Sequence, residues 1–206
     1  SGLGNEAITV SDTGSIAAST LSAIAAVNTT GTITATAAAT VTGTAAEIVA
    51  SFGNSTITEA NDVAINVNSG TASLAQARSM DGFTTGTVTA TIEDTRVSDL
   101  LGSTPLLDTN SNNAFTITIG TADAEITAAN LNSLNAKTSV AIEAGNVTKI
   151  TGTVAASNTA YAAAGNSQIN GLGNETVVIS GESSNKLSDA STLNTLDGYT
   201  TGTVNA

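Results

Sequence analysis

Short runs of alternating apolar and polar residues recur along this chain of 206 residues. Phe115, Ile117 and Ile119 alternate with two threonines, so that in an extended segment the apolar side chains would share one face. Such alternation among β-branched residues predicts a half-buried β-strand. The same pattern predicts strands in residues 7–10, 32–35, 63–67 and 176–179.

A second pattern, with apolar residues three or four positions apart, follows most of these runs. Leu74, Ala77 and Met80 would form one apolar stripe on a short helix. Similar stripes are formed by Leu21, Ile24 and Val27, by Ala45, Ile48, Val49 and Phe52, by Leu131 and Leu134, and by Leu193, Leu196 and Tyr199. The chain is therefore predicted to alternate between strands and short helices.

Some helix starts can be predicted from their capping residues. Thr44 followed by Glu47 has the spacing of a capping box, in which each side chain binds the backbone N–H of the other residue. Ser98 and Ser188 precede acidic and apolar residues and are predicted to be further N-caps.

One phrase occurs twice almost unchanged. Residues 81–90 return as residues 197–206, and residues 29–35 resemble part of both. We interpret the phrase as a corner at which a helix ends and the next strand begins, with Phe83 or Tyr199 closing the helical stripe and Gly82 or Gly198 at the helix end. Internal similarity of this kind is typical of repeat proteins.

The strand anchors give the repeat length. They are Val10, Ile33, Val67, Val88, Ile119, Val140, Ile179 and Val204. Steps of 21–25 residues alternate with steps of 31–39 residues. We therefore predict an α/β solenoid of stacked strand–short helix repeats with a parallel sheet, in a geometry like that of leucine-rich repeats.

This solenoid would occupy residues 1–206 as a single segment of a longer array. About seven turns would start near residues 7, 31, 63, 86, 114, 139 and 175. The alternative is a right-handed parallel β-helix. A run of immunoglobulin-like sandwiches is disfavoured, because it would lack the helical stripes.

Composition narrows the classes of function. The net charge is −12 with five basic residues, which argues against binding to nucleic acid or to anionic lipid. Cysteine and histidine are absent, which excludes disulfides, histidine bases and the usual zinc sites. No apolar run approaches the ~20 residues of a membrane span, so membrane insertion is not expected.

Two sets of polar residues are candidate sites. Asp108, Asn110 and Asn112 place oxygen atoms at alternate positions, as in the start of a calcium-binding loop. The glycine and distal glutamate of such a loop are missing, so a plain turn is the competing interpretation. No other cofactor is expected, and no acidic pair has a histidine beside it to suggest an enzyme.

The second set consists of threonines at outward strand positions. They are Thr9, Thr34, Thr87, Thr89, Thr116 and Thr118. Such a row could be a solvated sheet face, a contact with another copy or a glycan, or an ice-binding face.

Two phrases carry a resemblance to known proteins. Residues 8–13, Ile-Thr-Val-Ser-Asp-Thr, and residues 191–198, Ser-Thr-Leu-Asn-Thr-Leu-Asp-Gly, are similar to repeats in large cell-surface proteins of cyanobacteria and related bacteria. The resemblance implies surface-layer or adhesive roles, in some cases with calcium.

The predicted function follows from these observations together. It is a non-enzymatic structural module of an extracellular surface layer, filament or adhesin. Its partners would be other copies of itself or neighbouring repeats, and surface polysaccharide is a further partner to consider. The alternative is a glycan- or ice-binding module that uses the threonine face.

Overall fold

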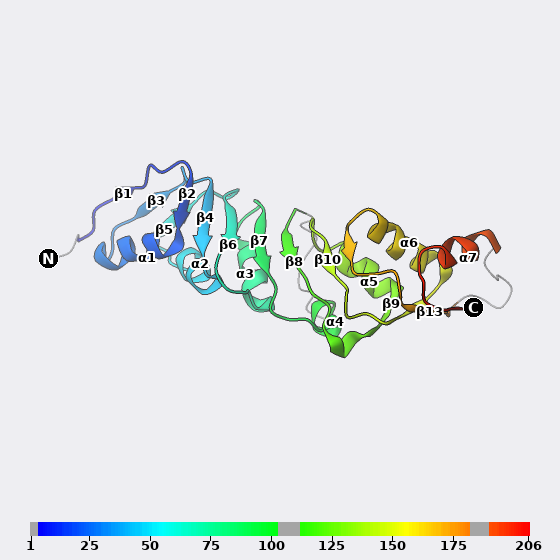
Figure 1. Cartoon of the computed structure of the whole chain (residues 1–206). Coiled ribbons are helices and arrows are strands. Elements are labelled where there is room, and N and C mark those ends of the chain that lie inside the picture. Colours follow the sequence, from blue (N-terminus) through cyan, green and yellow to red (C-terminus); the bar gives the residue numbers. More distant parts are fainter. Residues whose placement is uncertain (1–3, 103–111, 182–189) are drawn as a thin grey trace. The chain divides into compact units, whose positions relative to one another are not determined.

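The computed structural model describes residues 4–102, 112–181 and 190–206 (Figure 1). These residues form two compact units. Unit 1 contains residues 4–93 and 112–115, and unit 2 contains residues 94–102, 116–181 and 190–206. The part of the chain that is described holds seven α-helices, and all strand pairs of known register are parallel.

Unit 1 repeats a layer made of two short strands followed by one helix. The first layer contains β1 (Ile8–Thr9), β2 (Ser15–Ala17) and α1 (Ala18–Val27). The second contains β3 (Ile33–Ala35), β4 (Thr40–Gly43) and α2 (Ala45–Phe52). The third contains β5 (Ile57–Glu59), β6 (Ala64–Val67) and α3 (Leu74–Phe83), and β7 (Val88–Thr91) and β8 (Ala114–Thr116) follow.

The two strands of each layer belong to different sheets. First strands form the sheet β1-β3-β5, and second strands form the sheet β2-β4-β6-β7-β8. In the first sheet, Ile8 pairs with Ile33 and Ile33 pairs with Ile57, so equal residues lie in one row. In the second sheet, Val41 lies between Ile16 and Ile65 in the same way.

Unit 2 is built from the same kinds of element. It contains α4 (Val97–Leu100), the 3-10 turn η1 (Thr121–Asp123), β9 (Glu125–Thr127), α5 (Ala128–Asn135), β10 (Ile142–Glu143), β11 (Lys149–Gly152), α6 (Val154–Gly165), β12 (Ile169–Asn170), β13 (Thr176–Ile179), α7 (Ala190–Asp197) and β14 (Val204–Asn205). Its sheets are β10-β12 and β14-β13-β11-β9.

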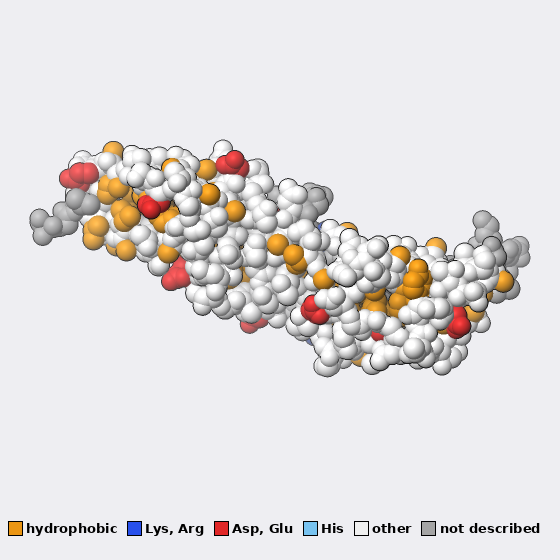
Figure 2. All heavy atoms as spheres, turned by 45° about the horizontal axis from the view of Figure 1, so that its top comes forward, with side chains coloured by type: hydrophobic (Ala, Val, Ile, Leu, Met, Phe, Trp, Pro, Cys, Tyr) orange, Lys and Arg blue, Asp and Glu red, His pale blue; other side chains and the backbone are white. Residues whose placement is uncertain are grey.

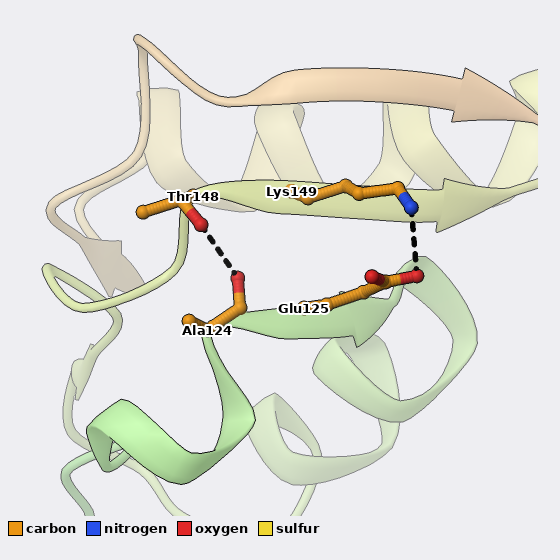
Figure 3. A network of polar contacts seen from close by, with 4 residues as sticks. All are labelled: Ala124, Glu125, Thr148 and Lys149. Atoms are coloured by element: carbon orange, nitrogen blue, oxygen red, sulfur yellow. Dashed lines mark hydrogen bonds and ion pairs between the residues drawn. The ribbon is translucent and has the colours of Figure 1, made fainter.

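Polar contacts join neighbouring strands at the solvent-exposed side of the unit 2 sheet (Figure 3). Lys149 on β11 forms an ion pair of 2.9 Å with Glu125 on β9. The hydroxyl of Thr148 donates a hydrogen bond of 3.2 Å to the carbonyl oxygen of Ala124. An exposed ion pair contributes at most ~1 kcal/mol, so these contacts support the strand register more than they stabilise the unit.

The core consists of small aliphatic side chains between the strands and the helices. Leu21 of α1, Ile48 of α2 and Ile33 of β3 are fully buried in unit 1. Leu131 of α5 and Ile150 of β11 are fully buried in unit 2. Because each layer is thin, residues of this size fill it without the large aromatic side chains that the composition lacks.

The predicted fold, an α/β solenoid with one parallel sheet, is wrong, and so is its alternative, a right-handed parallel β-helix. The described strands form four separate sheets. The chain turns between the two strands of a layer, as where the N–H of Ala38 donates to the carbonyl oxygen of Ala35 at 3.2 Å. This turn directs β4 into a different sheet from β3. The α/β class, the parallel pairing and the short helices are confirmed.

The long steps of the sequence repeat contain strands that the alternation did not reveal. β4 lies between the anchors Ile33 and Val67, and β11 lies between Val140 and Ile179. Each of these strands, Thr-Val-Thr-Gly and Lys-Ile-Thr-Gly, contains one apolar residue, so no alternation of apolar and polar residues marks it.

The predicted helix starts are partly correct. Thr44 and Glu47 form the expected capping box at the start of α2. Ser98 is not an N-cap, because α4 begins one residue earlier, at Val97. Ser188 lies outside the described residues. None of the helices described is long and apolar enough to cross a membrane.

Candidate functional site

The repeated Thr-Thr-Gly phrase forms a tight corner in unit 1. α3 ends at Phe83 and β7 begins at Val88, as the sequence predicted. The buried hydroxyl of Thr84 donates to the carbonyl oxygen of Val63 at 2.6 Å. The same hydroxyl accepts the N–H of Gly86 at 2.8 Å, which fixes the turn.

Unit 2 repeats the two hydrogen bonds of this corner. The hydroxyl of Thr200 donates to the carbonyl oxygen of Glu175 at 2.9 Å and accepts the N–H of Gly202 at 3.0 Å. A Cβ atom on Gly202 would overlap the carbonyl oxygen of Glu175, so only glycine lets the two chain segments approach so closely.

Both corners lead directly from a helix into the larger sheet of their unit, which is β2-β4-β6-β7-β8 in unit 1 and β14-β13-β11-β9 in unit 2. The layer that follows β5 therefore adds β7 to the second sheet but no strand to the first. In unit 2, the corner adds β14 beside β13, and β12 is not extended. Within the described residues, β5 and β12 are thus the last strands of their sheets, each with one open edge.

A groove lies beside the open edge of β5. We call it groove 1. It measures about 320 Å³ and is lined by Phe52, residues 57–61, Gly82 and Phe83. The rings of Phe52 and Phe83 are stacked, with centroids 5.2 Å apart and planes 9° from parallel. The groove is therefore bounded by a strand edge on one side and by the last turn of α3 on the other.

Groove 2 has the same construction beside β12. It also measures about 320 Å³, and its lining includes Tyr161, Gly165, residues 169–172 and Tyr199. The rings of Tyr161 and Tyr199 are stacked, with centroids 5.8 Å apart. Tyr199 is 40% exposed, whereas Tyr161 is 2% exposed, so Tyr199 presents the accessible ring.

Carboxylates lie at both grooves but in different roles. In groove 1, Glu59 is half-buried and accepts a hydrogen bond of 3.2 Å from the hydroxyl of Ser51. Burial raises the pKa of Glu59 above its ordinary value. Near groove 2, the fully buried Glu175 accepts hydrogen bonds from the hydroxyl of Tyr161 at 2.8 Å and from the N–H of Gly173.

The buried Tyr161–Glu175 pair has a structural role. Burial, together with the hydrogen bond to Glu175, raises the pKa of Tyr161 well above its ordinary value. Tyr161 therefore stays neutral and holds the carboxylate under the corner of Thr200. Tyr161 contributes to the wall of groove 2, whereas Glu175 is fully buried.

The predicted threonine face is divided among several sheets. Thr9 and Thr34 pair across the first sheet of unit 1, and the row continues to Thr58, which the sequence prediction missed. Thr89 lies on the second sheet, where it pairs with Asn66. The remaining predicted residues lie elsewhere: Thr87 directly precedes β7, Thr116 ends β8, and Thr118 forms a bridge with Glu143 in unit 2.

Two of the three predicted calcium ligands lie outside the residues that the structure describes. Asp108 and Asn110 are outside the described residues, and Asn112 is an exposed turn residue. Among residues that the structure describes, no cluster of three or more acidic side chains could hold a metal ion.

A further open surface lies at the first layer of unit 1. We call it the end face; it comprises the outer edges of β1 and β2 and the outer side of α1. Both strands are terminal in their sheets within the described residues. Ala23, Ala26 and Val27 of α1 are exposed, and Val27 is 48% exposed. Figure 2 shows hydrophobic side chains gathered over α1.

The sequence prediction missed the grooves because it treated the repeated phrase as a uniform corner. The signal that distinguishes these corners is the aromatic residue directly before Thr-Thr-Gly, Phe83 or Tyr199. The echo in residues 29–31 has no aromatic residue before it, and there the chain continues into β3. Comparison with protein-family models, curated proteins and solved structures finds no match.

Proposed function

We propose that this chain is a non-enzymatic structural module of an extracellular surface layer, filament or adhesin, and that it binds other copies of itself or neighbouring repeats. The observation that carries the proposal is the end face. Two open parallel strand edges and an exposed apolar helix side lie together on the first layer of unit 1. Open edges of this kind are templates for pairing with another chain.

The inner side of the same layer indicates what would fit on the outer side. There, β3 pairs in parallel with β1, β4 pairs with β2, and α2 packs against α1. A layer of the same construction therefore offers matching strands and a matching helix to the end face. Contact between an end face and a different surface of the next copy would be heterologous, and such contacts extend into filaments when they do not close.

Charge sets the conditions under which this contact forms. α1 contains no charged residue, so the helix side can be buried at low cost. The chain as a whole carries −12, so two copies repel each other at long range. We expect association to strengthen as salt rises from 0.01 to 0.15 M, because the Debye length falls from about 30 to about 8 Å.

Sedimentation velocity over a range of protein concentrations tests the proposal. The variant V27K should weaken self-association about tenfold, because it places a charge on the exposed apolar side of α1. The control A46K introduces the same charge at an exposed position of α2, outside the end face, and should leave association unchanged. A monomer at every concentration, with and without calcium, would refute the proposal.

The threonine row favours a second function, binding of a glycan or of ice. Thr9, Thr34 and Thr58 lie on three neighbouring strands, which places their side chains about 4.8 Å apart in a regular row. A glycan array and an ice-growth assay would test this function. The variant T34K should abolish binding, whereas T89K, on the other sheet, should not. Equal effects of the two substitutions would exclude the row as the site.

A further inference from the structure

We propose that groove 1 and groove 2 each bind a short extended peptide of a partner protein, which adds as a parallel strand beside β5 or β12. This inference concerns surfaces separate from the end face and does not rest on the proposed function. It follows from the strand positions that the two corners leave unfilled.

The sheet itself shows how the added strand would bond. Next to β1, Thr34 of β3 lies between Ile8 and Val10, and the N–H of Val10 donates to the carbonyl oxygen of Thr34 at 2.8 Å. Next to β10, the N–H of Ala144 donates to the carbonyl oxygen of Asn170 at 2.8 Å. One residue of the added strand thus occupies the place between two residues of the strand already present.

Each groove presents one backbone carbonyl oxygen and one backbone N–H in the positions that this pattern requires. In a parallel strand, alternate residues direct their backbone groups to opposite neighbours. The carbonyl oxygen of Thr56 accepts a hydrogen bond of 2.7 Å from the N–H of Ile33 of β3. The carbonyl oxygen of Ile57 and the N–H of Glu59 therefore point away from β3, toward groove 1. A peptide residue there would donate to the carbonyl oxygen of Ile57 and accept from the N–H of Glu59.

Groove 2 presents the equivalent pair. The carbonyl oxygen of Gln168 accepts a hydrogen bond from the N–H of Ile142 of β10. The carbonyl oxygen of Ile169 and the N–H of Gly171 therefore point away from β10, toward groove 2. The peptide residue would donate to the carbonyl oxygen of Ile169 and accept from the N–H of Gly171. Main-chain hydrogen bonds of this kind are the usual basis of strand addition at a sheet edge.

The walls of the grooves define the side chains of the partner. The row Ile8–Ile33–Ile57 predicts a β-branched aliphatic residue at the next position, where the stacked aromatic pair would cover it. At groove 1, the residue two positions later would face Glu59, since Ala35 of β3 pairs with Glu59. A lysine or arginine there would neutralise the half-buried carboxylate, so groove 1 should prefer a basic peptide.

The probe is the chain's own β3 segment, residues 30–37, Thr-Gly-Thr-Ile-Thr-Ala-Thr-Ala. A second probe replaces Ala35 by lysine. A third carries an N-methyl group on Thr34, which removes the N–H that would donate to Ile57 and Ile169. Binding of each probe to the full chain is measured by isothermal titration and by amide chemical shifts.

Two variants fill the grooves without backbone clash. A Cβ atom on Gly82 or on Gly165 meets no heavy atom within 4 Å, so G82L should fill groove 1 and G165L should fill groove 2. G14L is the matched control, because Gly14 is equally unobstructed and lines neither groove. Circular dichroism confirms that each variant is folded.

We expect amide shifts to place a peptide at both grooves in the unaltered chain and in G14L, at one groove in each single groove variant, and at neither groove in the double variant. The lysine peptide should bind groove 1 at least fivefold more tightly than the parent peptide, and E59Q should remove this preference. Binding located by amide shifts at residues 57–61 or 169–172 that survives in the double variant, or equal binding of the N-methyl peptide at these residues, would overturn the proposal. So would binding of oligosaccharides, but not of peptides, at the same grooves.

Discussion

The corner of unit 2 leads to a quantitative prediction for the variant T200V. Valine has nearly the shape of threonine but lacks the hydroxyl. In Thr200, this hydroxyl donates a hydrogen bond of 2.9 Å to the backbone carbonyl oxygen of Glu175 and accepts one of 3.0 Å from the N–H of Gly202. Thr200 is 8% exposed, so water cannot fully replace these bonds. Two net hydrogen bonds of about 1 kcal/mol each, with partners left partly unsatisfied, give a loss of about 2–3 kcal/mol.

The neighbouring residue supplies the control for this prediction. The hydroxyl of Thr201 donates to the carbonyl oxygen of Gly173 at 3.2 Å, but Thr201 is exposed. Water can take over that bond, so T201V should change the free energy of unfolding by less than about 0.5 kcal/mol. The two variants differ only in the burial and number of the bonds that they remove.

Urea unfolding followed by tyrosine fluorescence measures the difference within unit 2. The chain has two tyrosines and no tryptophan, and both tyrosines lie in unit 2. With an m-value of about 2 kcal/mol/M, T200V should lower the unfolding midpoint by about 1–1.5 M. Equal midpoints for T200V and T201V would refute the reasoning that the buried hydroxyl stabilises the corner.

Three further predictions concern unit 1. Because burial raises the pKa of Glu59, the folded chain binds this proton more tightly than the unfolded chain does, and the free energy of unfolding falls as the pH rises from the ordinary pKa of 4.5 through the raised value. The variant E59Q should remove this fall and should be more stable than the unaltered chain at pH 7. Thermal unfolding at pH 4 and pH 7 measures the difference. G86A should destabilise unit 1, because the added Cβ would lie 2.7 Å from the carbonyl oxygen of Val63. G82A, at an unobstructed position of α3, should instead stabilise the unit by about 1 kcal/mol in the same thermal unfolding assay. T44A should cost about 1 kcal/mol by removing the N-cap of α2, and hydrogen exchange at the first turn of that helix would detect it.

The apolar stripes located five of the seven described helices, because a helix repeats its apolar pattern over more residues than a short strand does; α6, the longest, has no such stripe and was not predicted. Leu74, Ala77 and Met80 cover two turns and correctly locate α3. β12 has only two residues, Ile169 and Asn170, which cannot show an alternation. Missing such strands merged two strands of a layer into one, and this produced the incorrect single sheet.

The candidate sites show a second limit of the sequence. The threonines were grouped because each occupies an outward position on a strand, but position on a strand does not specify which sheet the strand joins. Thr34 and Thr89 have similar sequence surroundings and lie on different sheets. The row was predicted correctly only for Thr9 and Thr34, whose strands are direct neighbours, and its third member, Thr58, was not predicted.

The copies of the corner phrase at residues 29–35 and 81–90 lead into different sheets. The reason is the number of residues between the end of the preceding helix and the next strand of the sheet β2-β4-β6-β7-β8. From Val27, where α1 ends, the chain has space for β3 before β4 begins at Thr40. From Phe83, where α3 ends, β7 begins after four residues, which is too short for a strand and a turn. The aromatic residue at the end of α3 then packs on Phe52 beside the place that a first-sheet strand would take. Groove 1 therefore results from a shortened connection, and lengthening the chain between Phe83 and Val88 by a strand such as Ile-Thr-Ala should close the groove from within.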